Sequence, residues 1–360
     1  MSLPARLLPR SARTFSTSLT AHNTPAVKVP INLIAELRKQ NPISLSKARQ
    51  ALAASNLDVP AALEWLSRDL ESSGAKKAAK VGARTTREGL IGVTVMGTRA
   101  AMVELRCETD FVAKNDIFRT LAENVCSTAA FLDLPSPTIT PQATAAVDPM
   151  VAFPIQELLH APVIPLDPSA SLTTGTPHAS SPQPQNITQA ITHAITTTGE
   201  NIQLQRAVSF SSPIPADAQN TTQPFLLPGV YVHGAVKPGG NEGKVGALVV
   251  LSSISTDPAT PIMDRVANEP SLGGDLQKMA RAIARQVVGF PTKGVSKDTS
   301  SGAPPVLEEG EVSPYLLDQP FMMYQGEQRT VKEVLDEWAA QRNVKVDVAS
   351  IRRWTVGEEE

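Results

Sequence analysis

The sequence predicts an α+β fold in which a small helical module precedes a two-lobed core of hairpins covered by helices. Two observations support this prediction. Apolar residues recur every three or four positions between residues 30 and 72, as they do on one face of a helix. Further along, residues 89–130 and 230–288 each contain two strand-like runs followed by one helical pattern. Hairpins followed by helices are typical of α+β architecture.

The N-terminal segment predicts a targeting signal. Arg6, Arg10 and Arg13 lie among Leu, Ala, Ser and Thr, and no acidic residue precedes Glu36. This composition is typical of a mitochondrial presequence. We therefore expect residues 1–29 to be a disordered presequence that directs the protein to the mitochondrial matrix. The alternative is a disordered tail without a targeting role.

Residues 30–72 predict three short helices. Asn41 and Pro42 would break the first helix, Ser46 can cap the second, and Pro60 suits the first turn of the third. A unit of about 40 residues is only marginally stable alone. The following run at 73–80 holds three lysines among Ala and Gly. It could suggest phosphate binding, but a solvated linker helix is the favoured interpretation.

The stretch at 103–115 is the most informative one in the chain. Its first half alternates apolar with polar residues, the apolar ones being Val103, Leu105 and Cys107. This period of two predicts a strand with one buried face. Thr109 and Asp110 are helix-capping residue types, and helical spacing resumes at Ile117, so a tight strand-to-helix corner lies between. Phe111 at this corner is either a core plug or a probe for a partner, and residue chemistry alone favours the plug.

Composition indicates a folded protein that carries inserts. The 360 residues leave room for two or three domains, and 30 of them are Pro while only 4% are aromatic. We expect a first core lobe at 73–134 and a disordered Pro/Ser/Thr-rich insert at 135–186, apart from a short helix near 155–160. The second core lobe would span 187–360, with a loose linker at 296–313.

The second lobe begins with a possible helix at 187–195 and a strand after residue 199. Its hairpin is predicted at 230–236 and 245–251. A helix at 275–288 follows, with an apolar face of Leu276, Met279, Ile283 and Val287. The end of the chain predicts a strand at 319–323, a helix at 330–340, and a strand pair or one long strand at 344–356.

No group of residues predicts catalysis or a cofactor. The two cysteines lack a metal or redox spacing, and the five histidines are scattered. The glycine-rich run at 238–244 joins two strands, whereas a phosphate loop joins a strand to a helix. A net charge of −2 provides no global attraction for nucleic acid, and no run approaches the ~18 apolar residues of a membrane span. We expect no catalytic site, no metal or cofactor, and neither nucleic acid nor membrane as a direct partner.

Several motifs resemble one known family. The run Cys-Glu-Thr-Asp-Phe-Val-Ala-Lys-Asn at 107–115 resembles the signature of translation elongation factor Ts, here in its mitochondrial form. Gly-Glu-Asn-Ile at 199–202, His-Gly at 233–234, and the Pro-Phe at 320–321 followed by 330–335 are also similar to that family. The helical module resembles the ubiquitin-associated fold, and a similar module in the family packs on the nucleotide-binding domain of elongation factor Tu.

The resemblance implies a guanine-nucleotide exchange factor for mitochondrial elongation factor Tu, which promotes GDP release by disturbing the Mg²⁺ and phosphate site of Tu. The implied contact residues are Thr109, Asp110, Phe111, Val112, Ala113, Leu45, His233 and Gly234. Phe111 would enter a gap between helices of Tu, and Asp110 would position the corner. From chemistry alone, His233 in a strand is more often a structural hydrogen-bonding group. The alternative function is a ubiquitin-binding adaptor that uses the helical module and leaves GDP release unchanged.

Overall fold

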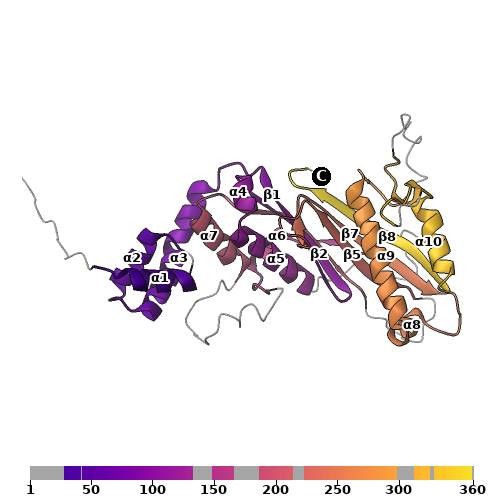
Figure 1. The fold of residues 1–360 in the computed structure, drawn as a ribbon, viewed down its shortest axis with the longest axis horizontal. Coiled ribbons are helices and arrows are strands. Elements are labelled where there is room, and N and C mark those ends of the chain that lie inside the picture. Colours follow the sequence, from indigo (N-terminus) through magenta and orange to yellow (C-terminus); the bar gives the residue numbers. More distant parts are fainter. Residues whose placement is uncertain are drawn as a thin grey trace, which may run out of the picture.

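The structure is a computed structural model that describes residues 28–41, 43–132, 148–165, 186–213, 223–297, 312–324 and 328–358. The predicted presequence at 1–29 lies almost entirely outside these residues, as do most of the insert at 135–186 and of the linker at 296–313. The described part of the chain is elongated, with a helical module at one end followed by two sheets and their covering helices (Figure 1). The α+β prediction is confirmed.

The helical module consists of α1 (Ile31–Gln40), α2 (Leu45–Ala54) and the first part of α3 (Val59–Val81). Its small core contains Ile34, Leu37, Ala51, Leu52 and Leu63. The cap of α2 differs from the prediction, because Ser44 and not Ser46 accepts a hydrogen bond from the N–H of Lys47. Helix α3 is 23 residues long and continues through the predicted linker run, so one rod joins the module to the core.

The first sheet has five antiparallel strands in the order β3-β4-β2-β1-β6. Its strands are β1 (Glu88–Met96), β2 (Arg99–Cys107), β3 (Val151–Ala152), β4 (Gln203–Ser211) and β6 (Glu242–Gly243). Helices α5 (Asp116–Phe131), α6 (Ile155–His160) and α7 (Ile187–Thr198) cover one face. Phe118, Val125 and Leu105 are among the buried side chains between helices and sheet.

The second sheet has three antiparallel strands in the order β5-β7-β8. Its elements are β5 (Phe225–His233), β7 (Val245–Ser255) and β8 (Val344–Thr355), with α8 (Ile262–Asn268), α9 (Pro270–Gly289), η1 (Leu316–Asp318) and α10 (Val331–Ala340). Helices α9 and α10 cover its outer face (Figure 1). Helix α9 buries the predicted apolar face of Leu276, Met279, Ile283 and Val287, although it begins five residues earlier than expected.

The two sheets pack against each other through a third apolar cluster. This cluster includes Ile91, Met102, Leu248, Val250 and Trp354. The core is therefore layered as helices, sheet, sheet, helices. Strand β2 lies in the inner part of this stack and is buried on both faces, which corrects the prediction of one buried face. The alternation of polar and apolar residues predicted one exposed face, but the polar residue Glu104 is fully buried. Its carboxylate accepts hydrogen bonds from Arg106 and Arg206.

Three predicted assignments differ from the structure. Residues 187–211 were predicted to belong to the second lobe, but they belong to the first. Helix α7 packs in the core of the first lobe, and β4 pairs with β2 in the first sheet. The short helix predicted near 155–160 is present as α6, and the residues of 148–165 on either side of it, predicted to be disordered, are ordered as well. Phe153 and Leu158 are buried against the first lobe. Residues 319–323 form no strand. They follow a 3₁₀ turn, and their one ladder contact is an isolated bridge between Pro320 and Thr330.

Candidate functional site

The corner (residues 109–115) is built by two helix starts placed close together. Thr109 caps the single-turn helix α4 (Asp110–Ala113), and its hydroxyl accepts a hydrogen bond from the N–H of Val112 at 3.4 Å. Asn115 caps α5 in the same way by accepting from the N–H of Ile117 at 2.8 Å. Because each cap fixes the chain direction at a helix start, the backbone turns sharply between β2 and α5.

Phe111 stands out from this corner. Its side chain is 82% exposed, whereas Val112 and Ala113 are 8% and 1% exposed and belong to the core of the first lobe. Phe111 is therefore no core plug. Val112 and Ala113 were predicted to contact a partner, but their burial leaves them an anchoring role. A large aromatic side chain held out from a buried anchor is unusual, because such side chains normally contribute to a core.

Asp110 is paired along the surface of the corner. The ammonium group of Lys114 donates to Asp110 Oδ2 at 2.8 Å, one helical turn away. This hydrogen bond lowers the pKa of Asp110, and the positive charges of Lys114 and Lys244 add to the effect. The carboxylate is thus charged at neutral pH, and a cation of a partner would compete with Lys114 for it.

The corner is also held by a residue that was not among the predicted contact residues. Both the N–H and the hydroxyl of Thr109 donate to the carboxylate of Glu200, at 3.0 Å and 2.6 Å. Glu200 lies in the loop between α7 and β4, ninety-one positions further along the chain. The only sequence signal for this contact was the Gly-Glu-Asn-Ile motif, because nothing in local spacing joins two residues so far apart.

The second part of the site is the turn at the end of β5. His233 and Gly234 are both exposed, and Gly234 has a φ of +76°, a left-handed value that favours glycine. The backbone N–H of Lys244 donates to the carbonyl oxygen of His233 at 2.8 Å. The side chain of the same lysine reaches Glu88 at 2.6 Å, and Glu88 pairs with Cys107 in the β1–β2 ladder just before the corner. Lys244 therefore connects this turn to the corner.

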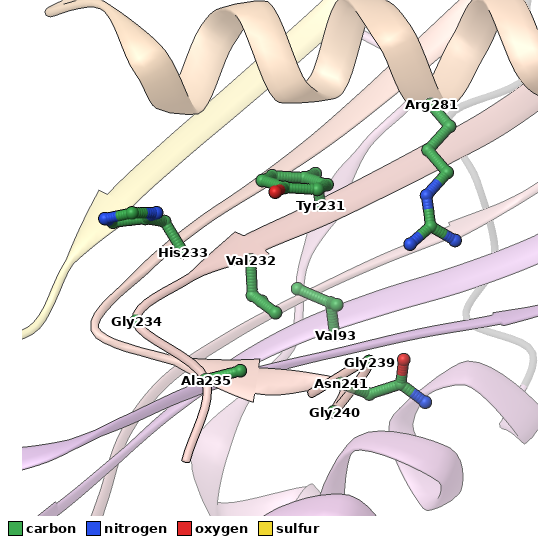
Figure 2. A pocket seen from close by; sticks show the side chains of 10 residues that line it. All are labelled: Val93, Tyr231, Val232, His233, Gly234, Ala235, Gly239, Gly240, Asn241 and Arg281. Atoms are coloured by element: carbon green, nitrogen blue, oxygen red, sulfur yellow. The ribbon is translucent and has the colours of Figure 1, made fainter. Parts of the chain in front are cut away.

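A small hollow of about 230 Å³ lies beside the turn. It is lined by Val93, Tyr231, Val232, His233, Gly234, Ala235, Gly239, Gly240, Asn241 and Arg281. Figure 2 shows His233 and Arg281 at opposite sides of the hollow, with the Tyr231 ring between them. The lining contains an arginine and a histidine but no carboxylate, so the hollow has a basic rim beside an exposed turn.

The 234–241 loop is tied to the first turn of α5. Lys237 donates to Asp116 Oδ1 at 2.9 Å, and Arg119 forms a buried ion pair with Glu242. Glu242 is fully buried in the short strand β6, within the glycine-rich run at 238–244 that was expected only to join two strands. Burial raises the pKa of neighbouring Glu123, with a further contribution from the Glu242 charge. Because α5 follows the corner directly, the loop and the corner share one support.

Leu45 is the remaining predicted contact residue, and the structure does not bring it to the corner. It is 53% exposed at the start of α2, which lies in the module at the end of the molecule (Figure 1). The predicted residues thus form a main surface around the corner and the His233–Gly234 turn, and a separate exposed site on the module.

Among the described residues, no three His, Cys, Asp or Glu side chains gather as metal ligands would. In the same ranges, none of the helices has the length and apolar character to cross a membrane. Both cysteines are buried and neither forms a disulfide, and burial raises the pKa of Cys107 to about 12. What the surface does offer is an exposed aromatic ring on a rigid corner, flanked by charged groups. This arrangement is typical of proteins that bind other proteins.

Comparison with known proteins identifies the family. No family model matches the chain. A protein named mitochondrial elongation factor Ts from Cryptococcus neoformans var. neoformans is 43% identical over 369 residues, covering 100% of this chain and 95% of that protein. The proteins of the same name from Laccaria bicolor and Coprinopsis cinerea are 37% and 35% identical, each over at least 95% of both chains. The chain therefore belongs to the mitochondrial elongation factor Ts family. It is a mitochondrial protein of translation elongation.

Proposed function

We propose that this protein is the guanine-nucleotide exchange factor of mitochondrial elongation factor Tu and that it promotes GDP release by disturbing the Mg²⁺ and phosphate site of Tu. The observation that carries the proposal is Phe111, which is 82% exposed at a corner whose neighbouring residues are buried. Membership in the elongation factor Ts family supplies the partner and the nucleotide. The chain acts by binding, and its own residues supply no chemical step.

The mechanism follows from thermodynamic linkage. If the factor binds nucleotide-free Tu more tightly than GDP-bound Tu, GDP binding is weakened by the same ratio. Phe111 provides this difference if its ring is buried only in the nucleotide-free shape of Tu, between helices beside the Mg²⁺ site. Burying one Phe side chain is worth about 1.5–3 kcal/mol, which corresponds to a coupling of roughly tenfold to a hundredfold.

The other residues support this insertion. Asp110 and Lys114 place a charged pair beside Phe111, where they would meet polar groups near the ion site of Tu. His233 and Gly234 would dock against Tu next to the corner, since Lys244 connects the two. Leu45 would dock separately through the module. Val112 and Ala113 act only from inside, by fixing the backbone from which Phe111 projects.

The test replaces Phe111 with alanine and follows the release of a fluorescent GDP analogue from mitochondrial Tu. We expect the release rate at saturating factor to fall roughly tenfold or more, because the transition to nucleotide-free Tu loses the buried ring. The chain offers a matched control in Phe131, which is 53% exposed at the other end of α5. Phe131→Ala should release GDP at the wild-type rate.

A wild-type release rate for Phe111→Ala would contradict the proposed role of the ring. A wild-type chain that leaves GDP on Tu unchanged and instead binds ubiquitin through its module would support the adaptor alternative. Thermal melting of both alanine variants serves as the folding check, and neither should shift because both side chains are exposed.

A further inference from the structure

We propose that Glu200 is a positioning residue for nucleotide exchange, which holds the corner so that Phe111 projects in one fixed direction. The inference rests on the proposed function, since it concerns how the ring is presented to Tu. It assigns a task to a loop residue that holds the corner through Thr109.

The contact between Glu200 and Thr109 is two-pronged. Glu200 Oε2 accepts from the Thr109 N–H at 3.0 Å, and Oε1 accepts from the Thr109 hydroxyl at 2.6 Å. Hydrogen bonds to a charged acceptor are stronger than those between neutral groups. Two bonds from one carboxylate fix both the backbone and the side chain of Thr109. Because Thr109 is the residue from which α4 starts, its orientation sets the direction of that helix.

The bonds pass directly into α4. The Thr109 hydroxyl donates to Glu200 and also accepts from the N–H of Val112, so its single proton has a fixed direction. Helix α4 has only four residues, and a helix of one turn cannot hold its own shape in water. Its stability must come from Thr109 on one side and from the buried Val112 and Ala113 on the other. Without Glu200, Thr109 keeps its own bond to Val112 but loses the two bonds that fix its orientation.

The loop that carries Glu200 is itself anchored. Gly199 ends α7 with a φ of +78°, and Asn201, which is 2% exposed, donates through its backbone to Glu108 Oε1 at 2.7 Å. The Asn201 side chain donates to the carbonyl oxygens of Gly82 and Arg84, just beyond the end of α3. The 199–201 loop therefore joins the corner to the end of the rod that carries the module. Because the Asn201 bonds fix the position of this loop without Glu200, the Glu200 carboxylate can hold Thr109 in place.

The experiment compares Glu200→Ala and Glu200→Gln with the wild type in the full chain, using GDP release from mitochondrial Tu. For Glu200→Ala we expect the release rate at saturating factor to fall about tenfold, because a misplaced ring loses the contact that is made only in nucleotide-free Tu. The factor concentration that gives half-maximal release should change less than about twofold, because the docking surfaces remain. Glu200→Gln keeps one acceptor oxygen and should recover part of the rate.

A double substitution separates positioning from a general structural role. Once Phe111 is alanine, there is no ring to position, so adding Glu200→Ala should cost little further rate. The matched control is Glu333→Ala, since Glu333 accepts from the N–H and hydroxyl of Thr330 in the same way at the start of α10. That variant should leave the release rate unchanged.

Cys107 provides a readout of the corner itself. Its thiol donates to the carbonyl oxygen of Thr109 at 3.2 Å and is buried, as is Cys126. A thiol reagent should modify Cys107 faster in Glu200→Ala than in Glu200→Gln while Cys126 stays protected. Both variants remove the Glu200 charge that raises the pKa of Cys107, but only alanine removes both acceptor oxygens, so the difference between them reports the corner. The inference is overturned if Glu200→Ala releases GDP at the wild-type rate, if its cost adds fully to that of Phe111→Ala, or if only the half-maximal concentration changes. Any of these results with a slow Phe111→Ala leaves the exchange function standing and removes only the role of Glu200.

Discussion

At the scale of single residues, Glu104 is a buried charge that connects several parts of the core. It is fully buried in β2 and accepts from Arg106 and Arg206 at 2.7 Å each, and from the N–H of Gly357 at 3.0 Å. The guanidinium group of Arg206 also lies 4.5 Å from the centre of the Trp354 ring. This one carboxylate therefore joins β2, β4 and the C-terminal end of the chain.

Replacing Glu104 with glutamine should destabilise the fold strongly. The amide keeps the shape but removes the buried negative charge to which Arg106 and Arg206 donate. Breaking a buried ion pair by removing one partner costs about 3–5 kcal/mol. The free energy of unfolding in urea measures this cost. Asp336→Asn is the control, since its pair with Lys332 is largely exposed, and it should change the unfolding free energy little. A small effect for Glu104→Gln would contradict this account of the core.

The sequence predicted the environment of a residue where that environment depends on its neighbours in the chain, and did not predict it where distant residues decide it. The capping role of Thr109 was predicted because a cap depends on its neighbours alone. The exposure of Phe111 ran against residue chemistry and was indicated only by the family resemblance. The burial of Glu104 could not be predicted, since its two arginines include one that is 102 positions away.

At the scale of elements, helix α9 and strand β5 of the second lobe approach each other closely. Helix α9 crosses β5 at Gly229, where an added Cβ would lie 2.5 Å from the backbone carbonyl of Ala280. No side chain fits there without a shift of the helix. The glycine in β5 is therefore required by packing and not by its backbone angles.

Gly229→Ala should lower the free energy of unfolding by about 1–3 kcal/mol, the usual cost of overpacking a tight interface. The same unit offers a matched control in Gly274, an exposed residue of α9 with no atom within 4 Å of an added Cβ. Gly274→Ala should instead stabilise the protein by about 0.5–1 kcal/mol, because alanine favours a helix. Urea unfolding of the two variants checks both signs, and equal effects would rule out the packing argument.

The sequence predicted most helices and strands, but it did not predict which strands pair with each other. The helix at 187–198 and the strand at 203–211 were visible in the sequence, but their membership of the first sheet was not. A period of two predicts a strand without saying which neighbour it pairs with. The short helix at 155–160 was predicted and is present as α6. The rest of 148–165 was missed, because its Pro-rich surroundings hid Phe153, which fixes it to the lobe.

At the scale of the whole molecule, the proposed contact residues Phe111 and Leu45 lie far apart along the long axis. The corner belongs to the first lobe, while Leu45 lies on the module at the N-terminal end of α3 (Figure 1). The last part of this rod is held by the Asn201 bonds to Gly82 and Arg84. A partner that touches both sites must therefore span the distance between them, and the two contacts can serve different purposes.

Leu45→Ala tests this division of roles. Contact at the module is remote from the nucleotide site, so we expect it to strengthen binding of GDP-bound and nucleotide-free Tu alike. Loss of such uniform binding raises the concentration for half-maximal release and leaves the saturated rate unchanged. We expect a rise of roughly fivefold to tenfold, which corresponds to about 1 kcal/mol of apolar burial. Ile31→Ala is the control. Ile31 is 81% exposed at the first residue of α1, whereas Leu45 begins α2, and Ile31 is not in the proposed contact. A fall in the saturated rate would instead mean that the module takes part in displacing the nucleotide, and the separation of docking from insertion would have to be abandoned.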